Sequence, residues 1–178
     1  MLRPLGTLSQ ILTPGAVFFQ SRIFIVGQFK KHHKVRTALL VTEAGSGTGI
    51  VIGTGDPAPG IAGATIASMG TPVTNAGVFA ADQSLPCVVV DTVQLSDGRP
   101  ALFVSVVDNN LADFGLNSTL QLVGGDTGNP QLSGLTSFSP VKVNNFGTAL
   151  IEGMTESGSS QKKGLFVLSG LAPVTSEL

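Results

Sequence analysis

Tryptophan and tyrosine are absent from this chain of 178 residues, and cysteine occurs once, at Cys87. Trp and Tyr are the amphipathic anchors most used in sites that recognise sugars, nucleic acids and proteins. Their absence argues against a carbohydrate-binding platform. A single cysteine excludes an internal disulfide, and the apolar run Cys87–Val90 predicts a small, buried and free thiol. Stability must therefore come from packing or from assembly.

Charge is also scarce, because charged residues make up 12% of the chain and hydrophobic residues 42%. The charged share is about half of that in ordinary soluble proteins. Such a surface is tolerated when neighbouring subunits cover much of it. The 23 glycines and 10 prolines lack a tripeptide period, which excludes collagen, and the many Val, Ile and Leu residues exclude a wholly disordered chain. The length is that of one domain.

Neither a secretory signal nor a membrane span is expected. Polar residues, glycine and proline between Arg3 and Pro14 interrupt any apolar stretch long enough for a signal peptide. The longest charge-free segment, residues 57–81, contains three prolines and several glycines, so it is not a regular membrane-spanning helix. We therefore expect synthesis in the cytoplasm without export, and no membrane partner.

The small net charge of −1 conceals an asymmetry along the chain. Residues 1–42 contain six Lys or Arg and no acid, which gives +6, whereas residues 43–178 contain four Lys or Arg and all 11 acids, which gives −7. A basic N-terminal arm with the first strands thus precedes an acidic β-rich body within one domain. This asymmetry indicates attachment to nucleic acid, to an acidic protein surface, or to an acidic neighbour of the same kind.

The only dense basic run spans residues 30–36 and contains four cations and two histidines. It could contact phosphates, but apolar segments at 16–19 and 23–26 precede it, which favours a solvated turn between strands or a protein contact. Adjacent histidines point apart in an extended chain, so a shared metal site at His32 and His33 is not expected. The predicted partner-binding residues are Arg3, Phe18, Phe19, Arg22, Phe24, Phe29, Lys30, Lys31, Lys34 and Arg36.

Short apolar runs between turn residues predict many strands, and no window sustains a helical apolar face. The clearest pair is 87–95 and 101–107 around Asp97-Gly98, where the turn favours a hairpin and Pro100 must begin the second strand. Both strands are apolar at successive residues, so both faces should be covered. We predict an all-β fold with at least seven strands, a sandwich or barrel-like body, with a jelly roll as one form, and an extended N-terminal arm.

The remaining motifs give no support to catalysis. The glycine-rich stretch in residues 45–60 lacks the Lys and the helix of a phosphate loop, so a long loop or a small-residue β segment is expected over 45–77. Ser68 lacks the first glycine of a nucleophile elbow. The acids of residues 108–115 fail the calcium-loop spacing, and spacing alone does not support acid–base chemistry at Asp91. We expect no enzyme, no cofactor and no metal.

These features are typical of an assembly subunit. They predict a structural virion protein, most concretely a capsid decoration (cement) subunit that stabilises an icosahedral phage-like shell. Its expected partners are the capsid shell protein and like subunits in a homo-oligomer, with nucleic acid less favoured, and its expected location is the virion. Two alternatives stay open: a small shell-forming coat protein whose basic part faces the genome, and a β-sandwich binding module of a tail or fibre or for glycans.

Overall fold

The computed structural model describes residues 7–12, 17–19, 22–31, 33–43, 47–74, 87–107, 118–124, 135–144, 147–157 and 160–171. These residues form thirteen β-strands and contain no helix, which confirms the all-β prediction. The strands make three antiparallel sheets, which we call the N-terminal, central and C-terminal sheets. The N-terminal sheet contains β1 (Thr7–Ile11), β2 (Val17–Phe19), β3 (Arg22–Lys31), β4 (Lys34–Glu43) and β5 (Gly47–Gly53); the central sheet contains β6 (Ile66–Met69), β7 (Val73–Thr74), β8 (Cys87–Leu95), β9 (Pro100–Val107) and β10 (Ser118–Val123); the C-terminal sheet contains β11 (Leu135–Val143), β12 (Ala149–Ser157) and β13 (Ser160–Leu168).

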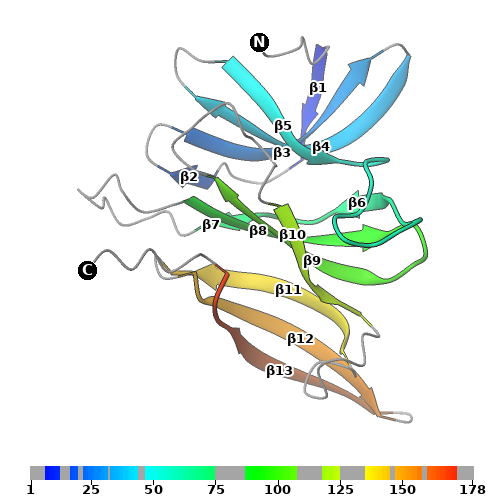
Figure 1. The fold of residues 1–178 in the computed structure, drawn as a ribbon, viewed down its shortest axis with the longest axis vertical. Helices are drawn as coiled ribbons and strands as arrows, with labels where there is room; N and C mark the ends of the chain where they lie inside the picture. The colour runs from blue at the N-terminus through cyan, green and yellow to red at the C-terminus, as the bar shows by residue number, and fades with distance from the viewer. Residues whose placement is uncertain are drawn as a thin grey trace.

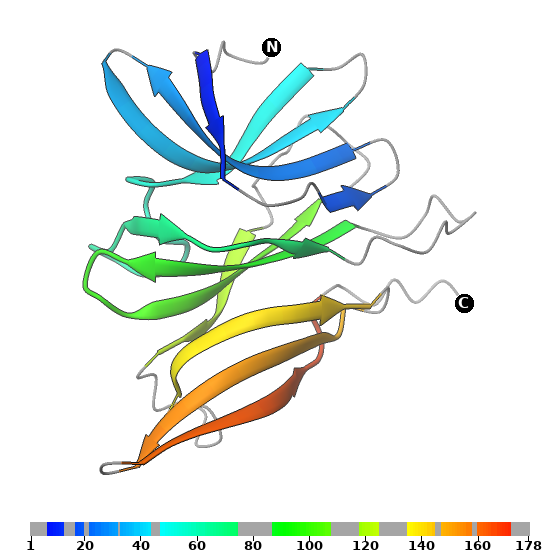
Figure 2. The ribbon, with the colours of Figure 1, turned by 180° about the vertical axis from the view of Figure 1, so that it is seen from behind.

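The three sheets stack as successive layers along the long axis of the molecule, with the central sheet in the middle (Figures 1 and 2). Strand order is β1-β3-β4-β5 in the N-terminal sheet, with β2 beside β3, and β10-β9-β8-β6 in the central sheet, with β7 beside β8. The C-terminal sheet has the order β11-β12-β13. A first core lies between the N-terminal and central sheets, and a second core lies between the central and C-terminal sheets.

The central sheet is covered on both faces, as its continuous apolar runs predict. Alternate side chains of a strand point to opposite faces. On β9, Phe103 belongs to the first core and its neighbour Leu102 to the second. On β8, Val89 belongs to the first core and its neighbour Val90 to the second. Each of these four side chains is fully buried, so the middle layer contributes to both cores.

The predicted hairpin between β8 and β9 is confirmed, and Pro100 begins β9. Its turn is of the three-residue kind, in which a type I turn is followed by a glycine with positive φ. The Leu95 carbonyl accepts a hydrogen bond from the Gly98 N–H at 3.0 Å. Only Gly98, at a φ of 88°, adopts a positive φ in this turn. The glycine of the Asp-Gly pair is therefore the residue that the turn requires.

Several sequence-based boundaries differ from the structure. The described strands form stacked open sheets, so the barrel alternative is wrong; each sheet pairs only within itself and packs face to face. Residues 7–11, which the sequence analysis assigned to the extended N-terminal arm, form β1, an edge strand paired with β3. The apolar segment 141–151 includes the end of β11 and the start of β12, which are separated by a turn that includes Gly147, at a φ of 68°. The side chain of Cys87 lies outside the described residues, so the buried, free thiol stays a prediction.

Candidate docking surface

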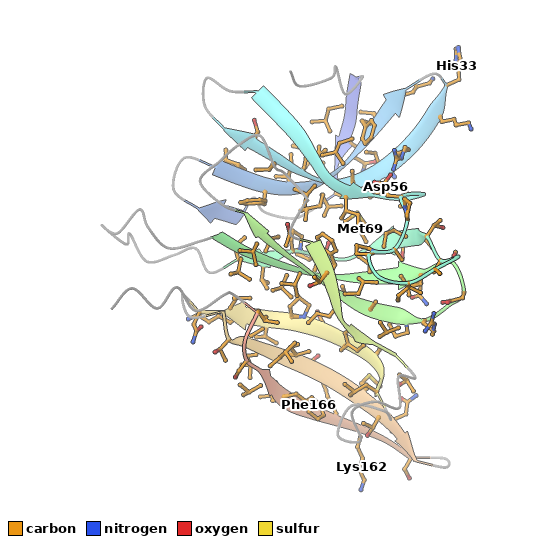
Figure 3. The ribbon with its side chains drawn as sticks, in the orientation of Figure 1. His33, Asp56, Met69, Lys162 and Phe166 are labelled. Atoms are coloured by element: carbon orange, nitrogen blue, oxygen red, sulfur yellow. The ribbon has the colours of Figure 1, made fainter. Side chains whose placement is uncertain are left out.

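The basic run forms the end of the β3–β4 hairpin, and Figure 3 shows His33 projecting there from the N-terminal sheet. Lys31 and Lys34 lie directly opposite each other in register. His33 has a φ of 65°, a left-handed conformation that costs a non-glycine residue about 1–2 kcal/mol. The side chains of Lys30, His33 and Lys34 are exposed. The expected solvated turn between two strands is therefore observed.

Two features of this hairpin end are locally unfavourable, and no ion pair between the described residues offsets them. Like charges directly opposite in a β ladder are destabilising. Among the described ion pairs, none involves Lys30 or Lys34. Locally unfavourable features, such as a pair of like charges or a non-glycine residue with a positive φ, are found most often at functional sites. Positive charge at this end is thus available to an acidic partner.

Arg36, which the sequence assigns to the partner, is engaged inside the subunit. Its Nε donates a hydrogen bond to the Thr54 carbonyl at 2.8 Å, and its guanidinium lies 2.6 Å from Oδ1 of Asp56. The other Asp56 oxygen, Oδ2, accepts the Gly53 N–H at 2.8 Å. The guanidinium carbon also lies 6.0 Å from the centre of the Phe29 ring. Arg36 therefore anchors the loop after β5 to β4.

We predict that Arg36→Ala lowers the free energy of unfolding by about 1–2 kcal/mol, because it removes a charge-assisted hydrogen bond and a second bond to a carbonyl. Lys34→Ala is the matched control, since Lys34 lies two residues earlier on the same strand face and is exposed. Its effect should stay within about 0.5 kcal/mol. Urea denaturation of both variants measures the difference, and equal midpoints would contradict the anchoring role.

Phe24 and Phe29 are not surface residues. Phe24 is buried in the first core, and Phe29 is buried with Ala38 and Leu40 in a third cluster on the other face of the N-terminal sheet. Their assignment to the partner surface is thus corrected, because alternation along β3 buries one on each face of the sheet.

Other predicted partner residues lie partly or wholly beyond the description. Phe18, Phe19 and Arg22 occupy strand positions, with Phe18 opposite Ile23 and Phe19 opposite Arg22. Their side chains, the side chain of Lys31 and the whole of Arg3 lie outside the described residues. The docking assignment of these five residues stays a prediction.

The structure adds apolar residues that sequence reasoning missed. The register places Leu8 opposite Phe29 and Ile11 opposite Gly27, on the outer face of the N-terminal sheet, away from the central sheet. Ile11 is 55% exposed and Leu8 is close to half exposed. Val35, 57% exposed, lies opposite Lys30 near the hairpin end. The apolar residues 8, 11 and 12 do not show the period of two of a strand, because a register shift between Leu8 and Gln10 interrupts the alternation, so the local sequence gave no clear signal for this strand. We call Leu8, Ile11, Lys30, Lys34 and Val35 the docking surface. Leu8, Ile11 and Lys34 lie on the outer face of the N-terminal sheet, whereas Lys30 and Val35 lie on the face of Phe24, so the docking surface includes residues from both faces of this sheet.

A second exposed apolar area lies at the opposite end of the stack. Leu165 and Val167 on β13 are 66% and 70% exposed, and Val141 on β11 is also exposed. Nearby, Lys163 Nζ lies 2.8 Å from Oε2 of Glu152. Figure 3 places Lys162 at this end, far from His33. Both terminal layers therefore present apolar side chains beside lysines.

Other site types find little support in the described part of the chain. No group of three or more His, Cys, Asp or Glu there could hold a metal ion. The described residues also contain no helix with the length and hydropathy needed to cross a membrane. Comparison with family models, with curated proteins and with solved structures found no match. The functional argument therefore depends on the geometry of the exposed surfaces.

Proposed function

We propose that this protein is a structural subunit of a virion, and specifically a decoration (cement) subunit that attaches to the outside of an icosahedral shell through its docking surface. The observation that carries the proposal is the combination of apolar and basic exposed side chains on the N-terminal sheet. Ile11 and Val35 supply apolar area, while Lys30 and Lys34 supply positive charge. Such a mixture fits an acidic protein surface with apolar patches.

The low charge of the chain supports an assembled rather than an isolated state. Exposed apolar side chains occur on both outer layers of the stack, and contiguous exposed apolar area marks interaction surfaces. In a cement subunit, one end layer contacts the shell and the other is available to like subunits. The role is mechanical, because added contacts between subunits oppose outward pressure on the shell.

The same surface favours a protein partner over nucleic acid. A phosphate-binding segment gains its affinity from charge neutralisation, whereas this surface places Val35 opposite Lys30. Burial of apolar area contributes about 25 cal/mol per Å², while an exposed ion pair contributes only about 0–1 kcal/mol. We therefore assign most of the attachment free energy to the apolar side chains.

The experiment compares two double variants in rebinding to particles stripped of this protein. Ile11→Ser with Val35→Ser should weaken binding by about 100-fold, from about 1.4 kcal/mol lost at each position. Lys30→Glu with Lys34→Glu should weaken it less, by about tenfold. Co-sedimentation with the particle measures both effects.

The matched control is Leu165→Ser with Val167→Ser at the opposite end, which should leave shell binding unchanged. Full occupancy by the Ile11 and Val35 double variant would overturn the docking surface. Release of the protein by nuclease would instead favour the shell-forming coat protein with its basic part on the genome. A full-length protein that remains monomeric and binds no particle would overturn the virion proposal itself.

A further inference from the structure

Asp91 is a carboxylic acid buried between two sheets. It has no solvent exposure, and alternation along β8 places it with Val89 and Val93, on the side of the first core. No donor among the described residues is placed to make a full hydrogen bond to either carboxyl oxygen. An unpaired buried charge is strongly unfavourable, so such a group is expected to hold its proton.

The surroundings of Asp91 offer no compensating charge among the described side chains. The inward-facing residues on the elements packed against this side of β8 are Phe24 and Val26 on β3, Leu39 and Val41 on β4, Ile66 on β6, Thr74 on β7, Phe103 and Ser105 on β9, and Leu120 on β10.

None of those residues is titratable. Arg22 and Glu43 lie opposite each other in register at the end of the β3–β4 ladder, and their side chains lie outside the described residues. Cys87 is the other titratable residue of β8. Burial raises the pKa of Asp91 from 3.8 to about 7, and the backbone N–H groups of Thr92 and Gly70 offset this rise only in part.

Asp91 lies beside a break in the edge of the central sheet. The ladder of β6 with β8 ends at Met69 opposite Val93, and that of β7 resumes at Val73 opposite Val90. Within the break, the Gly70 N–H donates a hydrogen bond to the Thr92 carbonyl at 2.7 Å. A Cβ at Gly70 would lie only 3.1 Å from Oδ1 of Asp91. Gly70 is exposed, so an exposed residue without a side chain lies against the buried carboxyl.

We propose that Asp91 makes the β6–β7 edge of the central sheet a pH-sensitive latch, which stays shut while the carboxyl is protonated and opens locally when the carboxyl must ionise. Opening at Gly70 brings water to the carboxylate with the loss of few ladder hydrogen bonds, because the ladder is already interrupted there. The latch is a property of the folded subunit, so it does not depend on the proposed function.

Hydrogen exchange of the full-length protein between pH 5 and pH 8 tests the latch. After correction for the intrinsic rate, protection over residues 66–74 and 87–95 should fall on the order of 100-fold across this range, with most of the loss below pH 7. Residues 149–168 of the C-terminal sheet are the internal reference, and at each pH their protection should stay higher than that of the edge, because the edge opens while the C-terminal sheet stays folded. In Asp91→Asn, protection at the edge should not change with pH.

Two further variants keep the test decisive. Asp91→Ala also lacks the carboxyl and should behave like Asp91→Asn if the latter folds poorly. Asp97→Asn changes an exposed carboxyl in the β8–β9 turn and should retain the wild-type pH dependence. The latch is overturned if Asp91→Asn and Asp91→Ala keep that dependence, or if the edge and the C-terminal sheet show equal protection at each pH, which would indicate that the edge exchanges only through global unfolding.

Discussion

Leu102→Ala and Phe103→Ala should each lower the free energy of unfolding by several kcal/mol, although the two residues are neighbours on one strand. Truncation of a buried leucine costs about 2–5 kcal/mol and that of a buried phenylalanine about 3–5 kcal/mol. In a sheet covered on one face, adjacent positions alternate between large and small effects. In the central sheet both effects are large, because Leu102 lies in the second core and Phe103 in the first.

The C-terminal sheet supplies the matched control for this prediction. Leu165 on β13 is 66% exposed, whereas its neighbour Phe166 packs against the second core. Leu165→Ala should change stability by no more than about 0.5 kcal/mol, and Phe166→Ala should cost more. Urea denaturation of the four variants measures these differences. If Leu102→Ala were as mild as Leu165→Ala, the C-terminal sheet would not cover the central sheet as the structure describes.

The central hairpin could be predicted because its signals are local. An apolar run, an Asp-Gly turn and a proline at the start of the next strand all indicate the same element. The continuous apolar character of Cys87–Leu95 also predicts two covered faces. The number of layers could not be predicted, since which elements cover those faces depends on contacts between distant residues. The short edge strand β1 was missed for the same reason.

For the docking surface, the sequence predicted the basic residues but not the apolar ones. The basic run placed Lys30 and Lys34 at an exposed hairpin end, where both are found. Phe24 and Phe29 were assigned to the partner surface because the alternation along a strand shows only which side chains share a face of the sheet. It does not show which face is covered by other parts of the chain. The pairing of Arg36 with Asp56 could not be predicted, because Asp56 lies on a loop beyond the next strand. A signal for Asp91 was present, since an acid inside the run Val88-Val89-Val90-Asp91 of a doubly covered strand must be buried.

Asp91→Asn should gain stability over the wild-type protein as the pH rises from 4 to 8. The folded pKa of about 7 lies above the unfolded value of 3.8, so between these values the folded state binds more protons than the unfolded state. Wild-type stability must therefore fall as the pH rises through this window and level off above it. A separation of about 3 pH units corresponds to a change on the order of 4 kcal/mol.

The difference between variant and wild type isolates this effect, because the other carboxyls titrate alike in both proteins and the fixed cost of burying an amide does not vary with pH. Asp97→Asn gives a control of opposite sign: hydrogen bonds from Arg99 hold the pKa of Asp97 below its ordinary value, so its stabilisation is lost as the pH falls. Denaturation with urea at half-unit pH steps gives both difference curves. A flat curve for Asp91→Asn between pH 4 and pH 7 would mean that the Asp91 carboxyl is ionised in the folded protein and finds a partner there.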